Sequence, residues 1–410
     1  MNVPKLRFKE FDGEWEEKEF GDLFEVKSGY AFKLKDYVSH GVSLINGESI
    51  QSDCIQTNNI NFLPDNFLVQ YKAFKLNTND IVLGLNRPII GGKLKIARVP
   101  EELNNSLLYQ RAGKIIFKSK ELCGSFFYTF LSKEIYKFAK KESVGSDQPF
   151  ISTTKLNKWK FTYPINLLEQ QKIGTLFEIL NKKIQLQQQK IDLLQEQKKG
   201  FLQKMFPKAG ETQPEIRFDG FTGNWKECKL GDVSNIIGGG TPSTSIEEYW
   251  NGNINWYSPV EIDEEIYVYE SRKKITEAGL KKSSARILPI GTVLFTSRAG
   301  IGNTAILARE GCTNQGFQSI VPLKEKLDSY FIFSRTEELK RYAEINGAGS
   351  TFVEISGKQM TKMPILLPGL KEQKKIGLFF KRLDDEIILQ KRKLKLIQQQ
   401  KQGFMQQMFI

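Results

Sequence analysis

The 410-residue sequence contains very little histidine and cysteine. His40 is its only histidine, and its four cysteines (Cys54, Cys123, Cys228 and Cys312) are far apart. A single histidine excludes His-rich metal sites and leaves no redundancy for Ser-His-Asp catalysis. Widely spaced cysteines fit reduced thiols in a cytosolic protein and exclude a zinc knuckle. We expect His40 to be a solvated loop residue, because no partner pattern surrounds it.

Long apolar runs and nucleotide-binding loops are also missing. No apolar run approaches the ~20 residues that a membrane-spanning helix requires, and the charged first residues show no signal-peptide pattern. Gly300 and Gly302 lack the third glycine of a dinucleotide fingerprint, which favours a turn between strands. Asp328, Glu338 and Lys340 imitate a metal-dependent nuclease site only loosely. We therefore expect a cytoplasmic protein that is not an enzyme by itself and holds no metal.

Positive charge, in contrast, is in excess. The 60 Lys and Arg residues exceed the 47 Asp and Glu residues, and the net charge is +13. Such a balance indicates a polyanionic partner, most often nucleic acid. Solubility alone is the alternative explanation.

The chain also contains an internal duplication. PKLRFKEFDGEWEEKEFGDLFEVKSG, residues 4–29, matches PEIRFDGFTGNWKECKLGDVSNIIGG, residues 214–239, at a constant offset. A second pair of segments aligns NRPIIGGKLKIAR, from Asn86, with SRAGIGNTAILAR, from Ser297. Between the matched blocks the two halves diverge. A duplicated scaffold with divergent inserts suggests two versions of one recognition task.

Local patterns predict mixed α and β structure in each half. DIVLGLN and GTVLFTS are short apolar runs that end in turn residues, which predicts buried strands followed by a turn and a second strand. A third pair of matching segments begins at Ser125 and Ser329. Its apolar residues have helical spacing, which predicts amphipathic helices that end at Gly145-Ser146 and Gly349-Ser350.

The fourth repeated block is a long heptad segment, LLEQQKIGTLFEILNKKIQLQQQKIDLLQEQKKGFLQKMF, which recurs near the end of the chain. Apolar residues at a and d positions predict two helices, each roughly 57 Å long, that pair through a narrow stripe. Parallel pairing in register would place Lys198 against Lys401, so we expect antiparallel pairing. The predicted interface comprises Ile173, Phe177, Leu180, Ile184, Ile191, Leu194, Ile376, Phe380, Leu383, Ile387, Leu394 and Ile397.

Four glycines recur inside these two helices, namely Gly174, Gly200, Gly377 and Gly403. A glycine costs about 1 kcal/mol in a helix interior. Their recurrence suggests close contact with another backbone, which could belong to a third protein. For Gly200 and Gly403, fraying helix ends are the alternative.

Together these features predict an α+β protein with two mixed α/β domains, each a twisted sheet with helices. The domains are related by duplication and joined by two long helices that form an antiparallel coiled coil. We predict a first domain at residues 1–166, a first helix at 167–207, a second domain at 208–369 and a second helix at 370–410.

This organisation resembles the specificity subunit of type I restriction–modification systems. The likeness is carried by WEEKEFGDL and WKECKLGDV and by the two repeated helices, and it spans essentially the whole chain. It implies two target-recognition domains, each of which reads one half of a bipartite, asymmetric double-stranded DNA sequence. It also implies that the helix pair is a spacer and a docking site for two methyltransferase subunits, which restriction subunits join.

The resemblance further implies that this chain holds no cofactor. S-adenosylmethionine, ATP and Mg²⁺ would belong to the partner subunits of an adenine methyltransferase and restriction endonuclease complex.

A structural scaffold protein built on a coiled coil is an alternative function, but such a protein would not need two elaborate domains. An RNA-binding protein is a further alternative, but the aromatic stretches typical of RNA-recognition motifs are missing.

The loops that follow the predicted strands are the candidate DNA contacts. Arg87 and Arg298 are aligned in the duplication, and each follows a strand into a turn that contains glycine. Arginine is the commonest reader of guanine; pairing with acidic residues, or contact with phosphate alone, are the alternatives. The candidate contacts are Lys27, Ser28, Gly29, Tyr30, Asn86, Arg87, Gly91, Gly92, Lys93, Gly239, Gly240, Thr241, Ser297, Arg298, Gly302 and Asn303.

Overall fold

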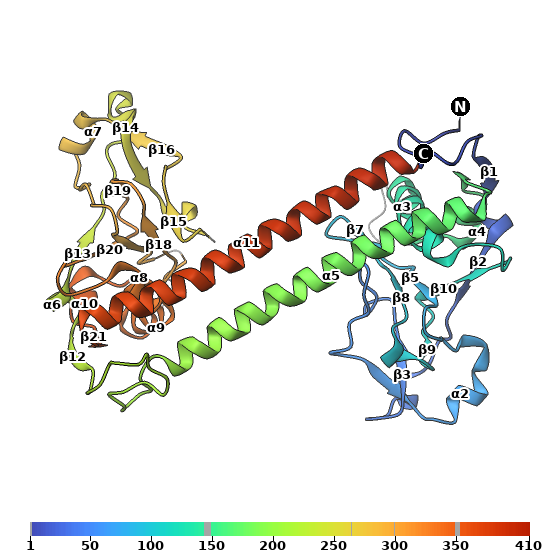
Figure 1. The fold of residues 1–410 in the computed structure, drawn as a ribbon, viewed down its shortest axis with the longest axis horizontal. Coiled ribbons are helices and arrows are strands. Elements are labelled where there is room, and N and C mark those ends of the chain that lie inside the picture. Colours follow the sequence, from blue (N-terminus) through green and yellow to red (C-terminus); the bar gives the residue numbers. More distant parts are fainter. Residues whose placement is uncertain (1, 143–148, 264, 299, 349–352) are drawn as a thin grey trace. The chain divides into compact units, whose positions relative to one another are not determined.

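The computed structural model describes residues 2–142, 149–263, 265–298, 300–348 and 353–410 (Figure 1). The chain divides into two compact units. Residues 1–187 and 393–410 form the first unit, and residues 188–392 form the second. Each unit holds one globular domain with portions of both long helices. The helix ends expected at Gly145-Ser146 and Gly349-Ser350 lie outside the described residues.

The first unit is built around a four-stranded antiparallel sheet with the order β2-β10-β5-β8. Helix α3 (Gly124–Glu142) covers one face, and residues of a smaller sheet pack on the other. Because both faces are covered, β5 is buried along its whole length, which explains its unbroken apolar run. The four strands are β2 (Phe24–Ser28), β5 (Ile81–Gly84), β8 (Ile96–Arg98) and β10 (Ala112–Phe117).

The smaller sheet of the first unit has the order β4-β3-β9. Its strands are β3 (Val42–Ile45), β4 (Asn61–Leu63) and β9 (Leu107–Leu108). The other strands form two short pairs, β1 with β11 and β6 with β7. The remaining elements are β1 (Glu16–Glu19), α1 (Phe20–Leu23), η1 (Leu34–Asp36), α2 (Phe67–Gln70), η2 (Lys72–Phe74), β6 (Ile89–Ile90), β7 (Lys93–Leu94), η3 (Glu101–Leu103), α4 (Thr153–Asn157) and β11 (Lys160–Tyr163).

The second unit repeats this plan with a five-stranded sheet in the order β13-β20-β17-β18-β15. The additional strand, β15, pairs in parallel with β18. The expected amphipathic helix is divided here into α8 (Ser329–Phe333) and α9 (Thr336–Asn346). The sheet strands are β13 (Ser234–Gly238), β15 (Tyr267–Val268), β17 (Val293–Phe295), β18 (Thr304–Leu307) and β20 (Gln318–Pro322).

A three-stranded sheet, β16-β14-β19, completes the second domain, and β12 pairs with β21. The sheet β16-β14-β19 corresponds to the smaller sheet β4-β3-β9 of the first unit, because β19 directly precedes β20 in the chain just as β9 precedes β10. The remaining elements are β12 (Lys226–Lys229), α6 (Leu230–Val233), η4 (Glu247–Tyr249), β14 (Trp250–Tyr257), η5 (Pro259–Glu261), β16 (Lys273–Ile275), α7 (Glu277–Lys281), β19 (Cys312–Thr313), α10 (Gly357–Thr361) and β21 (Pro364–Leu367).

The backbone hydrogen bonds correct the sequence alignment of the second repeated block. Leu85 N donates to Arg111 O at 3.1 Å, and Ser297 N makes the matching bond to Gly316 O at 2.8 Å. Leu85 therefore corresponds to Ser297, and Asn86, not Arg87, corresponds to Arg298. The turn that follows is four residues longer in the first unit, as the strand registers show. Matching identical letters across this insertion produced the error.

The long helices are α5 (Leu167–Lys204) and α11 (Leu370–Met408). In the first unit the rings of Phe177 and Phe409 stack 5.2 Å apart, which pairs the start of α5 with the end of α11. In the second unit Phe201 and Phe379 lie 5.0 Å apart, which pairs the end of α5 with the start of α11. The antiparallel arrangement and the two mixed α/β domains are therefore confirmed.

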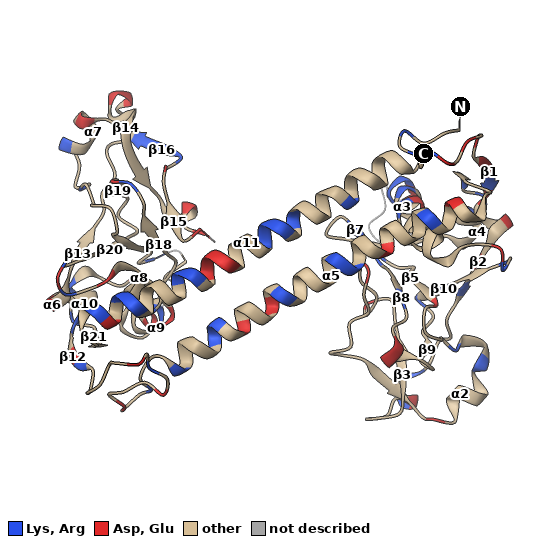
Figure 2. Cartoon of the chain, in the orientation of Figure 1, with Lys and Arg blue, Asp and Glu red and all other residues tan. Residues whose placement is uncertain are grey.

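The narrow apolar stripe predicted from the heptads faces the partner helix in each unit. Most charged residues of α5 and α11 are exposed, and they occur along both helices (Figure 2). Residues predicted for the interface are either buried or half-buried. The buried ones are Ile173, Phe177, Leu180, Ile191, Ile376, Phe380 and Ile387, and the half-buried ones are Ile184, Leu194, Leu383, Leu394 and Ile397.

The helix glycines fall into two kinds. A Cβ placed on Gly174 would lie 2.7 Å from Phe126 N, and one on Gly377 would lie 3.1 Å from Phe331 N. These two glycines thus admit the backbone of their own domain, and no third protein is needed to explain them. Gly200 and Gly403 have no neighbouring atom within 4 Å of a Cβ among the described residues, although the helices continue beyond them.

Candidate nucleic-acid interface

Each domain is anchored to the helix that follows it by a buried arginine–glutamate pair. Arg7 donates to both oxygens of Glu169, at 2.7 and 2.8 Å. Arg217 donates to both oxygens of Glu372 at the same two distances. The hydrogen bond to Glu169 raises the pKa of Arg7, so the guanidinium stays charged. The beginning of the first repeated block, which contains Arg7 and Arg217, therefore has a structural role.

Two predicted loops of the first unit meet at one edge of its sheet. Residues 27–30 comprise the end of β2 and the two residues after it, and residues 86–93 come after β5, while β10 runs antiparallel between these strands. The turn 109–111, which leads into β10, consequently lies between the two loops. Gln110 N donates to Tyr30 O at 3.1 Å, on one side of this turn. We call residues 27–30, 86–93 and 109–111 the first loop edge.

Cationic side chains are exposed along the first loop edge. Arg87 is exposed and has a left-handed backbone, with φ of 43°. Lys93 and Arg111 are also exposed. Within the described residues the Arg87 guanidinium has neither an acidic partner nor a hydrogen bond, so the alternative that it pairs with an acid has no support. An unpaired, exposed guanidinium is suited to a phosphate or to the edge of guanine.

Some predicted contacts in the first unit have a backbone explanation instead. A Cβ on Gly29 would overlap the carbonyl group of Leu108, so glycine is required for close approach at this position. Gly91 and Gly92 form the exposed tip between β6 and β7, with φ of 55° and 74°. Glycine favours these left-handed conformations. Ser28 and Asn86 are exposed and remain predicted contacts.

The second unit has an equivalent edge, formed by residues 238–241, 297–303 and 314–316. Ala299 lies outside the described residues. Thr241 is exposed, and its hydroxyl contacts Oε1 of Gln315. Arg298 is half-buried, and the described residues include no acidic partner for it. We call this set the second loop edge.

The other predicted residues of the second loop edge are held by the protein. A Cβ on Gly239 would overlap the Asn314 carbonyl oxygen, and Gly240 is buried. Ser297 is fully buried, and its hydroxyl has no partner among the described residues. Gly302 is buried with φ of 92°, while the Asn303 side-chain amide donates to Ile262 O at 3.3 Å.

Sequence reasoning missed the turns 109–111 and 314–316. Their segments, LLYQRAG and CTNQGFQ, share only one identical residue at matching positions, Gln110 with Gln315. That single match gave no usable signal without the strand registers. Sequence reasoning also missed Lys95, which is buried. Its Nζ donates to Gly47 O at 2.6 Å. Burial lowers the pKa of Lys95.

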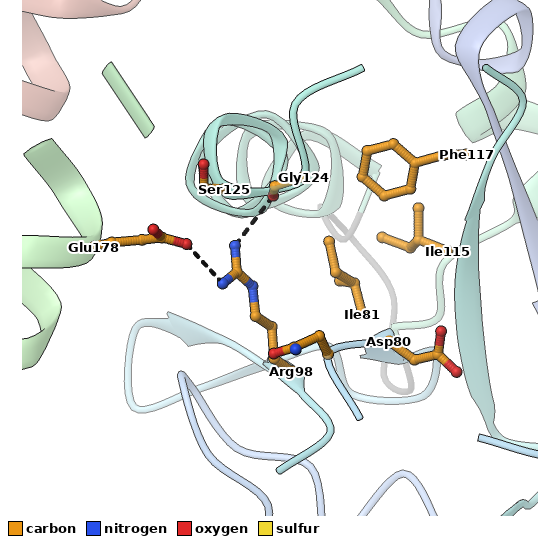
Figure 3. Close-up of a pocket in the computed structure, with 9 residues that line it drawn as sticks. Asp80, Ile81, Arg98, Ile115, Phe117, Gly124, Ser125 and Glu178 are labelled. Atoms are coloured by element: carbon orange, nitrogen blue, oxygen red, sulfur yellow. Dashed lines mark hydrogen bonds and ion pairs between the residues drawn. The ribbon is translucent and has the colours of Figure 1, made fainter. Parts of the chain in front are cut away.

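A pocket of about 260 Å³ opens on the helix side of the first-unit sheet (Figure 3). Arg98 crosses it, with Nη1 3.0 Å from Glu178 Oε1 and Nη2 donating to Gly124 O at 3.1 Å. Its guanidinium also lies 4.7 Å from the centre of the Tyr128 ring. These partners already satisfy Arg98, which links the sheet to α3 and α5. The pocket therefore has a structural role and is separate from the loop edge.

The seam lysines of the helices face carboxylates. Lys198 Nζ lies 2.6 Å from Asp384 Oδ1, whose other oxygen accepts a bond from the Tyr330 hydroxyl at 2.8 Å. Lys401 Nζ lies 3.5 Å from Asp53 Oδ2, and the Tyr128 hydroxyl donates to Asp53 Oδ1 at 2.7 Å. Burial, with the adjacent carboxylate, raises the pKa of both tyrosines. Each lysine is thereby neutralised within its own unit.

The described residues contain no group of three or more His, Cys, Asp or Glu side chains that could hold a metal ion. No helix among them combines the length and apolar character needed to cross a membrane.

A family model described as the type I restriction modification DNA specificity domain matches residues 12–196 and again residues 222–399. The MjaIX specificity subunit of Methanocaldococcus jannaschii is 37% identical over 178 residues, which cover 43% of this chain and 41% of that protein. The alignment therefore spans less than half of that relative. The putative MjaX specificity subunit of the same organism is 25% identical over 418 residues, covering 98% of this chain and 95% of the relative.

Solved structures share the fold at low sequence identity. The type I restriction–modification S subunit from M. genitalium has a TM-score of 0.63 at 14% identity, covering 100% of this chain and 99% of that one. A chain from a study of complex assembly and conformational transition of the type I system has a TM-score of 0.53 at 17% identity, with coverage of 95% and 96%. At these identities the likeness concerns the fold alone.

Proposed function

This chain belongs to the type I restriction modification DNA specificity family, whose domain it carries twice, and we propose that it is the specificity subunit of such an enzyme. In this proposal it reads a bipartite, asymmetric sequence in double-stranded DNA, with one half-site for each domain. It does so in the cytoplasm and has no catalytic activity of its own.

The observation that carries the proposal is the pair of loop edges. In each unit, loops that are far apart in the sequence come together at one end of a sheet and place there an arginine without an acidic partner among the described residues, exposed Arg87 in the first unit and half-buried Arg298 in the second. Arginine and lysine bind phosphates without regard to sequence, whereas side chains that reach base edges distinguish sequences. Two edges built on one plan but bearing different side chains are suited to two different half-sites.

The helix pair is proposed to hold the partner subunits. Its outward faces remain exposed along α5 and α11, and they carry many charged residues (Figure 2). Two methyltransferase subunits would dock on them, and restriction subunits would join the complex. S-adenosylmethionine, ATP and Mg²⁺ would be bound by those partners, which together would act as an adenine methyltransferase and endonuclease.

The test is to purify the chain together with its methyltransferase subunits and to sequence the sites that the complex methylates. We expect one bipartite motif, with two specified segments separated by bases of any identity. The chain alone, supplied with S-adenosylmethionine, ATP and Mg²⁺, is the control and should neither methylate nor cleave DNA. A single continuous motif, or turnover by the isolated chain, would contradict the proposal.

A further inference from the structure

We propose that Gln110 and Gln315 are specificity-determining residues, each of which reads one base edge in the half-site of its own domain. This inference rests on the proposed function and extends it to residues that neither loop prediction contained. Gln110 lies just before β10, which pairs with β2 and β5 in the first unit. Gln315 lies just before β20, which pairs with β13 and β17 in the second.

The two glutamines occupy equivalent positions, as the backbone hydrogen bonds around them establish. Tyr109 N donates to Ile45 O, and Asn314 N donates to Tyr257 O, each at 2.9 Å. The residue after each glutamine also matches, because the carbonyl oxygens of Arg111 and Gly316 accept the bonds that define the neighbouring strand register. This equivalence is independent of any sequence alignment. By the same registers, Arg87 and Arg298 are not equivalent.

Both side chains are exposed at the tip of a constrained turn. Gln110 and Gln315 are exposed, although the residues that lead into their turns, in β9 and β19, are buried. In the first unit Ala112 N donates to Tyr109 O at 2.9 Å and closes the turn. In the second unit Gly316 N donates to the side chain of Asn314 at 2.8 Å. A constrained backbone presents the amide group beyond the end of the sheet with little loss of freedom on binding.

Packing does not require glutamine at either position. Within the described residues the Gln110 amide has no hydrogen-bond partner. The Gln315 amide oxygen contacts the Thr241 hydroxyl, but the residue that corresponds to Thr241 in the first unit is Ala31, which has no side-chain donor. A shared structural role is therefore absent. A shared role in binding remains, because within the described residues the Gln110 amide and the Gln315 amide nitrogen have no hydrogen-bond partner and both side chains are exposed at the loop edge.

The chemistry of the neighbourhood suits a base edge. A primary amide offers a donor and an acceptor side by side, which match N7 and the N6 amino group of adenine in the major groove. A Cβ on Gly316, next to Gln315, would lie 3.5 Å from Arg298 Nε. Arg111 follows Gln110 directly and is exposed. Each amide thus has a cation beside it that can also contact DNA while the amide reads adenine.

The experiment uses the complex with its methyltransferase subunits and profiles all methylated sites for Gln110→Ala, Gln110→Glu, Gln315→Ala and Gln315→Glu. Each alanine variant should lose roughly 5- to 150-fold discrimination for adenine at one position of one half-site. Each glutamate variant should shift that position towards cytosine, because a carboxylate only accepts hydrogen bonds. The other half-site should be unchanged.

Lys120→Ala is the matched control, since Lys120 is exposed beyond the opposite end of β10. It should leave the base preferences unchanged, and the melting temperatures of all variants should equal that of the parent. An unchanged profile in the glutamine variants, or a uniform loss at every position, would overturn the inference while the parental bipartite motif still stood. If the parent complex itself showed no bipartite motif, the proposed function would fail instead.

Discussion

In both units the same arginine–glutamate pair joins the domain to the helix that follows it, and we call this pair the joint. The polar contacts of the sheet differ between the units at the equivalent strands β8 and β18. Arg7 with Glu169 and Arg217 with Glu372 have the same geometry and nearly the same burial. At the outer strand, Arg98 corresponds by register to Ile306, which is buried beside the additional strand β15. The duplicated joint is thus preserved, whereas the surface of each sheet has diverged.

The neutralisation of the seam lysines shows the same contrast. In the second unit the carboxylate comes from the partner helix, since Lys198 lies in α5 and Asp384 lies in α11. In the first unit it comes from a loop of the domain, because Asp53 lies between β3 and β4. A lysine in a coiled-coil seam needs an acidic partner, but the partner's origin is free to differ. Lys401 of α11 is thus paired with the first domain, whereas Lys198 of α5 is paired with α11.

The largest effect is expected from breaking the shared joint. Arg7→Ala and Arg217→Ala each leave a glutamate that is about 99% or 98% buried without its cation. Such a loss costs about 3–5 kcal/mol of unfolding free energy. Urea unfolding of both variants measures it, with Arg309→Ala as the control, because its pair with Glu270 is exposed. A loss below ~1 kcal/mol in either variant would show that the joint is not the anchor.

A smaller effect concerns the loop edges. Arg87→Ala should relax base selection in the half-site of the first domain, and Arg298→Ala in that of the second. A lost arginine–guanine contact corresponds to roughly 1–3 kcal/mol of discrimination. Methylated-site profiling of the complex separates the two half-sites. Equal weakening at every base would indicate phosphate contacts for that arginine.

The ion pairs of Lys198 and Lys401 should contribute different amounts to the free energy of unfolding. Asp384→Ala removes a carboxylate that is 8% exposed and leaves the Tyr330 hydroxyl buried without its acceptor, so we expect a loss of about 1–3 kcal/mol. Asp53→Ala also leaves a buried tyrosine hydroxyl, that of Tyr128, without its acceptor, but the carboxylate that it removes is 50% exposed, so we expect a smaller loss of about 1 kcal/mol. Urea unfolding compares them directly. Equal losses would contradict the different burial of the two sites.

The smallest effect is a rise of stability with pH, which we expect in the first unit. Burial, with the Lys137 charge, lowers the pKa of Lys133 to about 8. Folding therefore disfavours the charged form, and this penalty falls as the pH rises from about 8 towards the ordinary value near 10.4. Stability should rise over that range by at most about 1 kcal/mol, because the side chain is partly exposed. Lys133→Met should remove the rise in urea unfolding measured at pH 8 and pH 10.

The position equivalent to Lys133 in the second unit is Glu337, which offers a test within the same chain. Hydrogen exchange resolved by unit should show the rise in the first unit and none in the second. A rise of equal size in both units would mean that another group is responsible.

The sequence by itself determined the duplication, the mixed α/β domains and the antiparallel helix pair. Heptad positions and apolar runs are local patterns, and they reveal which face of a helix or strand is buried. The like charges at Lys198 and Lys401 were enough to choose the direction of pairing. Their actual partners, Asp384 and Asp53, were not predictable, because one comes from the other helix and one from a distant loop.

Only the tertiary structure decided which loop residues are equivalent. Arg87 and Arg298 are both arginines in similar motifs, yet by strand register Asn86 is the residue that corresponds to Arg298. The turn that follows is four residues longer in the first unit. Gln110 and Gln315 lie in segments with almost no identity, yet their backbones coincide. Strand register depends on which side chains are buried in the core, and this is a non-local property. Where the turn between two strands varies in length, the register cannot be read from the sequence alone.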